Sequence, residues 1–99
     1  MESKKYVIVR TYAMGVFAGE LDAESTETKK VLINARRIWY WSGAASLSQL
    51  AMDGTSRPVD CKFPAPVSRV ELTSPQGFEI LDVTPKARES ITMVPEWKA

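Results

Sequence analysis

Residues 31–54 read VLINARRIWYWSGAASLSQLAMDG, and they contain the strongest strand and helix signals in the chain. Its first part, from Val31 to Trp41, is rich in β-branched and aromatic side chains, which favour a strand. The pair Asn34-Ala35 is a place where a β-bulge could redirect the second half of that strand. We therefore predict one long strand over residues 31–41.

A short helix is expected directly after this strand, because the small residues 42–46 end the β pattern. The helical signals are the apolar positions Leu47, Leu50 and Ala51, the capping pair Ser46 and Gln49, and the terminal glycine Gly54. Together they predict a helix of about two turns.

The rest of the chain supplies four more strands and a second helix. The predicted strands are Tyr6–Tyr12, Val16–Leu21, Val67–Thr73 and Phe78–Val83. Thr84-Pro85 has the pattern of a helix cap followed by proline in the first turn, which favours a short helix ending near Met93. The tail from Val94 to Trp97 is expected to be extended.

The predicted fold is a single α+β domain over residues 1–99. It is a small curved antiparallel sheet or half-barrel of about five strands, with a short helix between strands 3 and 4 and another near the C-terminus. Such a small domain has sheet edges to cover. We therefore expect a homo-oligomer, a dimer or a tetramer, in which Trp97 either packs between copies or folds back on its own core.

Missing residue types exclude several kinds of active site. The chain has no histidine and one cysteine, Cys61. Histidine-based nucleophilic catalysis and a zinc site are therefore impossible, and the acidic residues are scattered without a paired motif. We expect a non-enzymatic protein with no cofactor and no metal. The lone cysteine and the lack of a long apolar span favour a reducing cytoplasm and no membrane partner.

The densest chemistry lies in residues 36–41. On a strand, Arg37, Trp39 and Trp41 share one face, while Arg36, Ile38 and Tyr40 share the other. Whichever face is open would offer aromatic rings beside a guanidinium group. Rings stack on nucleobases and arginine pairs with phosphate, so either face suits a planar, anionic ligand.

The predicted helix start adds small side chains beside these rings. Ala44, Ala45 and Ser46 would let a ligand approach free backbone N–H groups, which favour phosphate. Ser48 and Gln49 could contact a base edge. Tyr12 could face the same site if strands 1 and 3 are neighbours. Each feature also has an ordinary structural explanation, such as core aromatic packing or a solvated helix face.

The charge balance separates a polymer from a small ligand. The chain has 13 basic and 12 acidic residues, a net charge of +1, whereas proteins that hold long nucleic acids generally carry a basic excess. A long nucleic acid is therefore disfavoured. A small nucleotide needs only two or three cations, which residues 36–41 and their neighbours could supply.

The sequence also resembles a family of small phage and prophage proteins of unknown function. The resemblance rests on residues 5–12, 15–19, 35–41, 43–51 and 61–63. Its most specific part is the Trp39-Tyr40-Trp41 run with the segment Ala45-Ser46-Leu47-Ser48-Gln49-Leu50. It covers almost the whole chain except the hairpin tip, residues 22–29, and the proline-containing end. The resemblance implies a viral accessory protein in the host bacterial cytoplasm.

The resemblance and the residue pattern together predict a protein that sequesters a cyclic oligonucleotide or related nucleotide immune signal. By holding this signal, such a protein, called a sponge, inhibits antiphage defence. Two alternatives remain open. The aromatic segment could instead be a hot spot for a host or virion protein, or the sheet could bind a short single strand of nucleic acid.

Overall fold

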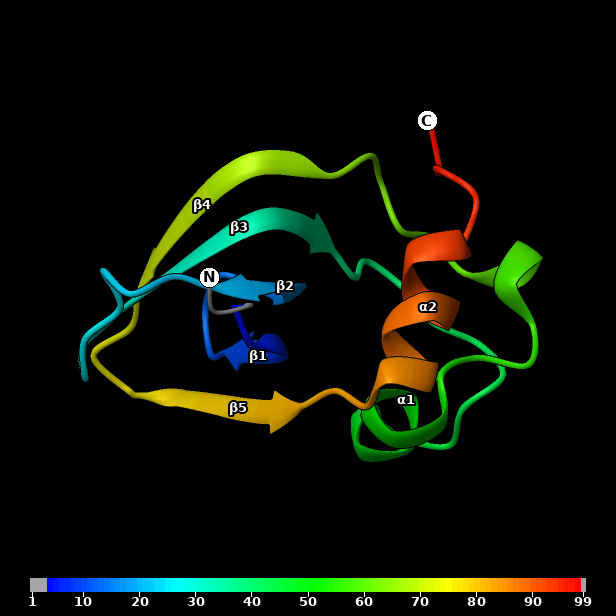
Figure 1. The fold of residues 1–99 in the computed structure, drawn as a ribbon, viewed down its shortest axis with the longest axis horizontal. Coiled ribbons are helices and arrows are strands. Elements are labelled where there is room, and N and C mark those ends of the chain that lie inside the picture. Colours follow the sequence, from blue (N-terminus) through cyan, green and yellow to red (C-terminus); the bar gives the residue numbers. More distant parts are fainter. Residues whose placement is uncertain (1–3, 99) are drawn as a thin grey trace.

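The computed structural model describes residues 4–98, and within them five strands form one antiparallel sheet in the order β4-β3-β2-β1-β5 (Figure 1). The strands are β1 (Tyr6–Thr11), β2 (Val16–Leu21), β3 (Lys29–Arg37), β4 (Val67–Thr73) and β5 (Phe78–Asp82). Helix α1 (Leu47–Asp53) lies between β3 and β4, and helix α2 (Pro85–Met93) follows β5. The predicted α+β class is confirmed, with both short helices in the predicted places.

The sheet is strongly curved. Strands β4 and β5 are at opposite edges, yet only residues 74–77 separate them in sequence. The five Cα steps from Thr73 to Phe78 span at most about 18 Å, so the two edges converge at this turn. The ammonium group of Lys30 lies 5.5 Å from the ring centroid of Phe78, which joins the beginnings of β3 and β5. Figure 1 shows the strands curling away from this turn towards the helices.

Curvature buries both faces of the central strands. Val7, Ile8 and Val9 on β1 are all fully buried. Ile8 belongs to the apolar cluster that includes residues of both helices, whereas Val7 and Val9 belong to a second cluster enclosed by the curled sheet. One face is therefore covered by α1 and α2 and the other by the sheet itself.

A β-bulge lies in the middle of β3, as predicted. Ala18 of β2 pairs with Arg36, but Glu20 pairs with Ile33, so Asn34 and Ala35 together oppose a single residue. Asn34 has a φ of +52°. The bulge changes which face successive residues occupy: Leu32 and Ala35, three positions apart, belong to the same cluster inside the curl. As a result Arg36 is turned to the helix side and Arg37 to the other.

The predicted end of the third strand was wrong, because β3 ends at Arg37 and not at Trp41. Its partner β2 begins at Val16, whose carbonyl accepts a hydrogen bond from the Ile38 amide. Beyond that point no backbone of β2 remains to pair with. The chain leaves the sheet, and Tyr40 forms an isolated bridge with Lys62. The period-two assignment of faces therefore does not apply to residues 39–41.

Both helices have the predicted caps. The Gln49 amide donates a 3.2 Å hydrogen bond to the Ser46 hydroxyl at the start of α1. The Ala87 amide likewise donates to the hydroxyl of Thr84 at the start of α2, and Pro85 is the first residue of that helix. The two helices are joined by a bond of 2.7 Å from the Thr84 hydroxyl to the Met52 carbonyl.

The C-terminal segment folds back on its own chain. The Trp97 amide donates a 3.0 Å hydrogen bond to the Phe63 carbonyl, and Glu96 forms a parallel bridge with the same residue. The half-buried indole of Trp97 also lies under the Lys62 ammonium, at 5.5 Å. Of the two predicted environments for Trp97, the structure shows contacts with its own core.

Candidate functional site

A hollow lies where the β1–β2 turn meets the end of β3, and we call it the Trp39 hollow. It has a volume of about 380 Å³. Five of the residues that line it determine its chemistry: Met14, Gly15, Arg37, Trp39 and Trp41. The structure thus brings together the three residues that the sequence placed on one face, although two of them lie beyond the strand.

Arg37 supplies the positive charge of the Trp39 hollow. Its Nη1 donates a 3.0 Å hydrogen bond to the Met14 carbonyl, and its guanidinium carbon lies 4.3 Å from the Phe17 ring centroid. Gly15, with a φ of +94°, permits this approach, because a Cβ there would lie 3.1 Å from the same nitrogen. Within residues 4–98 no carboxylate forms an ion pair with Arg37. The hollow therefore has a positioned cation without a counterion.

The two indoles of the hollow have different roles in the fold. Trp39 is 65% exposed, so its ring is free to stack on a ligand. Trp41 is half-buried against the apolar cluster under the helices, and its Nε1 donates to the Ala44 carbonyl at 3.2 Å. Trp39 is therefore the open surface and Trp41 a fixed wall.

Arg36 does not line the Trp39 hollow. Only 4% of the residue is exposed. Its Nε donates to the Pro64 carbonyl and its Nη2 to the Phe63 carbonyl, both at 3.0 Å. Its Nη1 donates to the Ile91 carbonyl at 2.9 Å. Most of its donors are thus used within the fold, and Arg37 is the arginine left for a ligand in this hollow.

Tyr12 and Tyr40 also lie outside the Trp39 hollow. Strand β2 separates β1 from β3, so the condition for Tyr12 to face the site is not met. Tyr12 instead lines a separate depression with Gln76 and Gly77. Tyr40 is 52% exposed, and the Lys62 ammonium lies 5.9 Å from its ring.

The sequence predicted free backbone N–H groups for phosphate at the start of α1, but two of these groups are bonded to side chains of the same segment. The Ala45 amide donates to Oε1 of Gln49 at 2.6 Å, and the Gln49 amide is taken by Ser46. Helix α1 has only seven residues. Ala44, Ala45, Ser46, Ser48 and Gln49 are absent from the lining of the Trp39 hollow.

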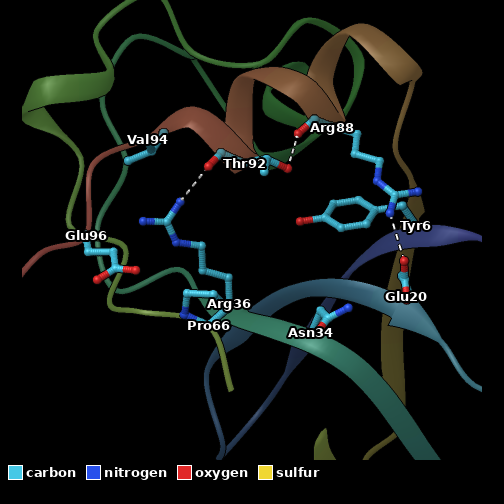
Figure 2. A pocket seen from close by; sticks show the side chains of 9 residues that line it. All are labelled: Tyr6, Glu20, Asn34, Arg36, Pro66, Arg88, Thr92, Val94 and Glu96. Atoms are coloured by element: carbon cyan, nitrogen blue, oxygen red, sulfur yellow. Dashed lines mark hydrogen bonds and ion pairs between the residues drawn. The ribbon is translucent and has the colours of Figure 1, made fainter. Parts of the chain in front are cut away.

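A second cavity lies between α2 and the sheet, and Arg36 is the one predicted site residue among the residues that line it. Its lining includes Tyr6, Glu20 and Arg88, which are far apart in sequence and meet only through the topology (Figure 2). Arg88 Nη2 lies 2.8 Å from a carboxylate oxygen of Glu20, and its guanidinium carbon lies 4.7 Å from the Tyr6 ring centroid. Burial raises the pKa of Tyr6, and the positive charge of Arg88 opposes this effect.

The described residues hold neither a metal-binding cluster nor a membrane-spanning helix. In the part of the chain that the structure describes, no three His, Cys, Asp or Glu side chains gather in a way that could hold a metal ion. The helices in this part are all too short or too polar to span a bilayer.

Comparisons with known proteins identify the family. No curated protein matches the chain, and no solved structure matches it. A family model matches residues 4–91, and the chain therefore belongs to the family described as Domain of unknown function (DUF6948).

Proposed function

We propose that this protein is a non-enzymatic binding protein that takes a nucleotide, specifically a cyclic oligonucleotide or related signal, in the Trp39 hollow. The single observation that carries this proposal is the position of Arg37, a cation without a carboxylate partner in residues 4–98, beside the exposed ring of Trp39. The base stacks on Trp39, and the phosphate pairs with the Arg37 guanidinium.

The energetics of the two contacts suit such a ligand. Stacking of a base on an aromatic side chain contributes about 1–3 kcal/mol. A charge-assisted hydrogen bond from arginine to phosphate is roughly twice as strong as a neutral one. Arg37 is already held by the Met14 carbonyl and the Phe17 ring, so little side-chain entropy is lost when it binds.

The size of the hollow supports a shared site. At about 380 Å³ it is near the low end of ligand pockets, which span about 300–1,000 Å³. It accommodates one base with its phosphate, and the remainder of a cyclic oligonucleotide extends outwards. A second copy of the chain covers that remainder, in a dimer or tetramer, and slows release of the ligand.

The biological role that we propose is sequestration. A phage-encoded protein that holds a nucleotide immune signal in the host cytoplasm, without altering it, lowers the free concentration of that signal. This role rests on the resemblance to small phage proteins and on the composition, which has no histidine and so lacks the commonest general base.

Calorimetry with a panel of cyclic dinucleotides, cyclic trinucleotides and cyclic ADP-ribose isomers tests the proposal. We expect micromolar or tighter binding of at least one compound, and a loss of about 1–3 kcal/mol on Trp39→Ala. Arg37→Ala should weaken binding while Arg69→Ala, a matched change at an exposed arginine of β4, should not. Absence of micromolar binding across the panel would overturn the proposal.

Native mass spectrometry of the protein purified from infected bacteria tests the shared site. The expected result is a dimer or tetramer carrying a small co-purified mass. A monomer that binds the nucleotide with full affinity would contradict the role of the second copy.

A second candidate function is a protein-binding surface. Large apolar side chains are exposed at the same end of the sheet, namely Tyr12, Met14, Trp39 and Tyr40, and Trp, Tyr and Arg dominate binding hot spots. A pull-down from host lysate separates the two functions. Stoichiometric capture of a protein, lost on Trp39→Ala and without a bound nucleotide, favours this candidate.

A further inference from the structure

The cavity between α2 and the sheet is separate from the Trp39 hollow and has chemistry of its own. Its volume is about 350 Å³, within the range of small-molecule sites. Figure 2 shows the Tyr6 ring entering it from β1, with the hydroxyl directed towards the Arg36 side, while Glu96 lies at the opposite end from Arg88. Apolar surface is supplied by Val94 and Pro66.

Arg36 brings a positive charge that the fold does not neutralise. All of its hydrogen-bond partners in residues 4–98 are backbone carbonyls, and it forms no ion pair there. Nη2 carries two N–H groups and donates to one carbonyl, that of Phe63. Burial lowers the pKa of Arg36, which reflects the cost of keeping this charge away from water.

Glu96 brings a negative charge to the same cavity. The tail that carries it is fixed by the bridge to Phe63. Its carboxylate is near enough to Arg36 to favour the charged guanidinium, yet it forms no ion pair in the described part of the chain. The cavity thus holds two opposite charges that do not meet.

The other charged pair in the cavity is already complete. Arg88 and Glu20 bind each other at 2.8 Å, and Arg88 also covers the Tyr6 ring. Because Arg88 and Glu20 already bind each other, neither needs a charged group from a ligand. The groups left for a ligand are Arg36, Glu96, the Tyr6 hydroxyl and the side chain of Asn34, which sits on the bulge at the rim.

We propose that this cavity is a second binding site, for a free amino acid with an apolar side chain. The ligand carboxylate binds Arg36 and the Tyr6 hydroxyl, the ligand ammonium binds Glu96, and its side chain packs on Val94 and Pro66. A simple anion would be repelled by Glu96 and a simple cation by Arg36. A zwitterion with an apolar body satisfies both charges and the apolar wall.

Calorimetry with L-leucine and two of its derivatives tests this proposal on the intact protein. N-acetyl-leucine lacks the ammonium and leucinamide lacks the carboxylate. We expect roughly millimolar or tighter binding of leucine and at least about tenfold weaker binding of each derivative, because each loses one charged contact. Equal binding of leucine and N-acetyl-leucine would overturn the proposal, as would no binding of leucine at 10 mM, a limit of about 2.7 kcal/mol.

Substitutions that spare the fold assign the contacts. Glu96→Gln should weaken leucine binding at least about tenfold and should strengthen the binding of N-acetyl-leucine, because it removes a repelling charge. Tyr6→Phe should weaken the binding of both. Glu89→Gln, on an exposed part of α2 outside the cavity, is the matched control and should change neither. Unchanged leucine binding in Glu96→Gln would overturn the proposal. Nucleotide binding at the Trp39 hollow should be the same in all three variants, so the two sites fail or succeed independently.

Discussion

Arg36 Nη1 donates a hydrogen bond of 2.9 Å to the carbonyl oxygen of Ile91, a residue 55 positions further along the chain. The bond joins the bulged half of β3 to the C-terminal part of α2. The same guanidinium binds the Phe63 and Pro64 carbonyls. One side chain thus joins the end of β3, the segment Phe63-Pro64 and the end of α2.

Replacing Arg36 should destabilise the fold far more than replacing its neighbour. Arg36→Ala removes charge-assisted hydrogen bonds to the Phe63, Pro64 and Ile91 carbonyls, and in residues 4–98 the Pro64 carbonyl is left with no other donor. We expect a loss of about 3–5 kcal/mol in the free energy of unfolding. Arg37→Ala loses one exposed hydrogen bond and a ring contact, about 1–2 kcal/mol. Urea denaturation measures both, and equal losses would contradict the structural role of Arg36.

Gly54 should tolerate no side chain. It ends α1 with a φ of +77°, and a Cβ there would lie 2.4 Å from the Ser90 side chain. Gly54→Ala is expected to cost about 2–4 kcal/mol from backbone strain and steric overlap. Gly77 has a similar φ, +92°, but an open surrounding, so Gly77→Ala should cost only about 1–2 kcal/mol. Thermal melts distinguish the two, and a Gly77 variant as unstable as the Gly54 variant would show that overlap with Ser90 is unimportant.

Tyr6 should make stability depend on pH in the alkaline range. Burial raises the pKa of Tyr6 above its usual 10.0, so near and above pH 10 the unfolded state loses this proton before the folded state does. The contribution of Tyr6 is therefore fully present below pH 10 and declines as pH rises through the folded pKa. Urea denaturation between pH 8 and 11 should show a steeper decline in the wild type than in Tyr6→Phe. Parallel declines would refute the shift.

Trp39 should dominate the accessible tryptophan fluorescence. Its ring is 65% exposed, whereas Trp41 and Trp97 are half-buried. Trp39→Phe is expected to reduce the emission that acrylamide quenches and to shift the remaining emission to shorter wavelength. A nucleotide that binds the Trp39 hollow should protect the wild type from acrylamide. Trp97→Phe is the control, and it should leave that protection intact.

Much of the local structure was predictable because its signals lie within a few residues. Strands β2 and β4 begin and end where the sequence pattern places them. The caps at Ser46 and Thr84 are also where the sequence indicates them. A helix cap depends on hydrogen bonds between residues about three apart, so the few residues around the cap are sufficient to predict it.

The end of β3 was not predictable from its own residues. Ile38, Trp39 and Tyr40 have the composition of a strand, but a strand needs a partner. The pairing of β3 with β2 stops where β2 begins, at Val16. Residues 38–41 carry no signal of where their partner strand begins.

The candidate site divides in the same way. The sequence alone identified a segment, residues 36–41, in which arginines and indoles are adjacent, and it showed that catalysis by histidine is impossible. Which of the two arginines is buried depends on contacts that form in the folded protein. The bulge at Asn34-Ala35 sets which face each residue occupies, and the carbonyls of Phe63, Pro64 and Ile91 then take the donors of Arg36. A buried charge must be satisfied by hydrogen-bond partners, and the partners of Arg36 are distant in sequence, so no local pattern could identify them.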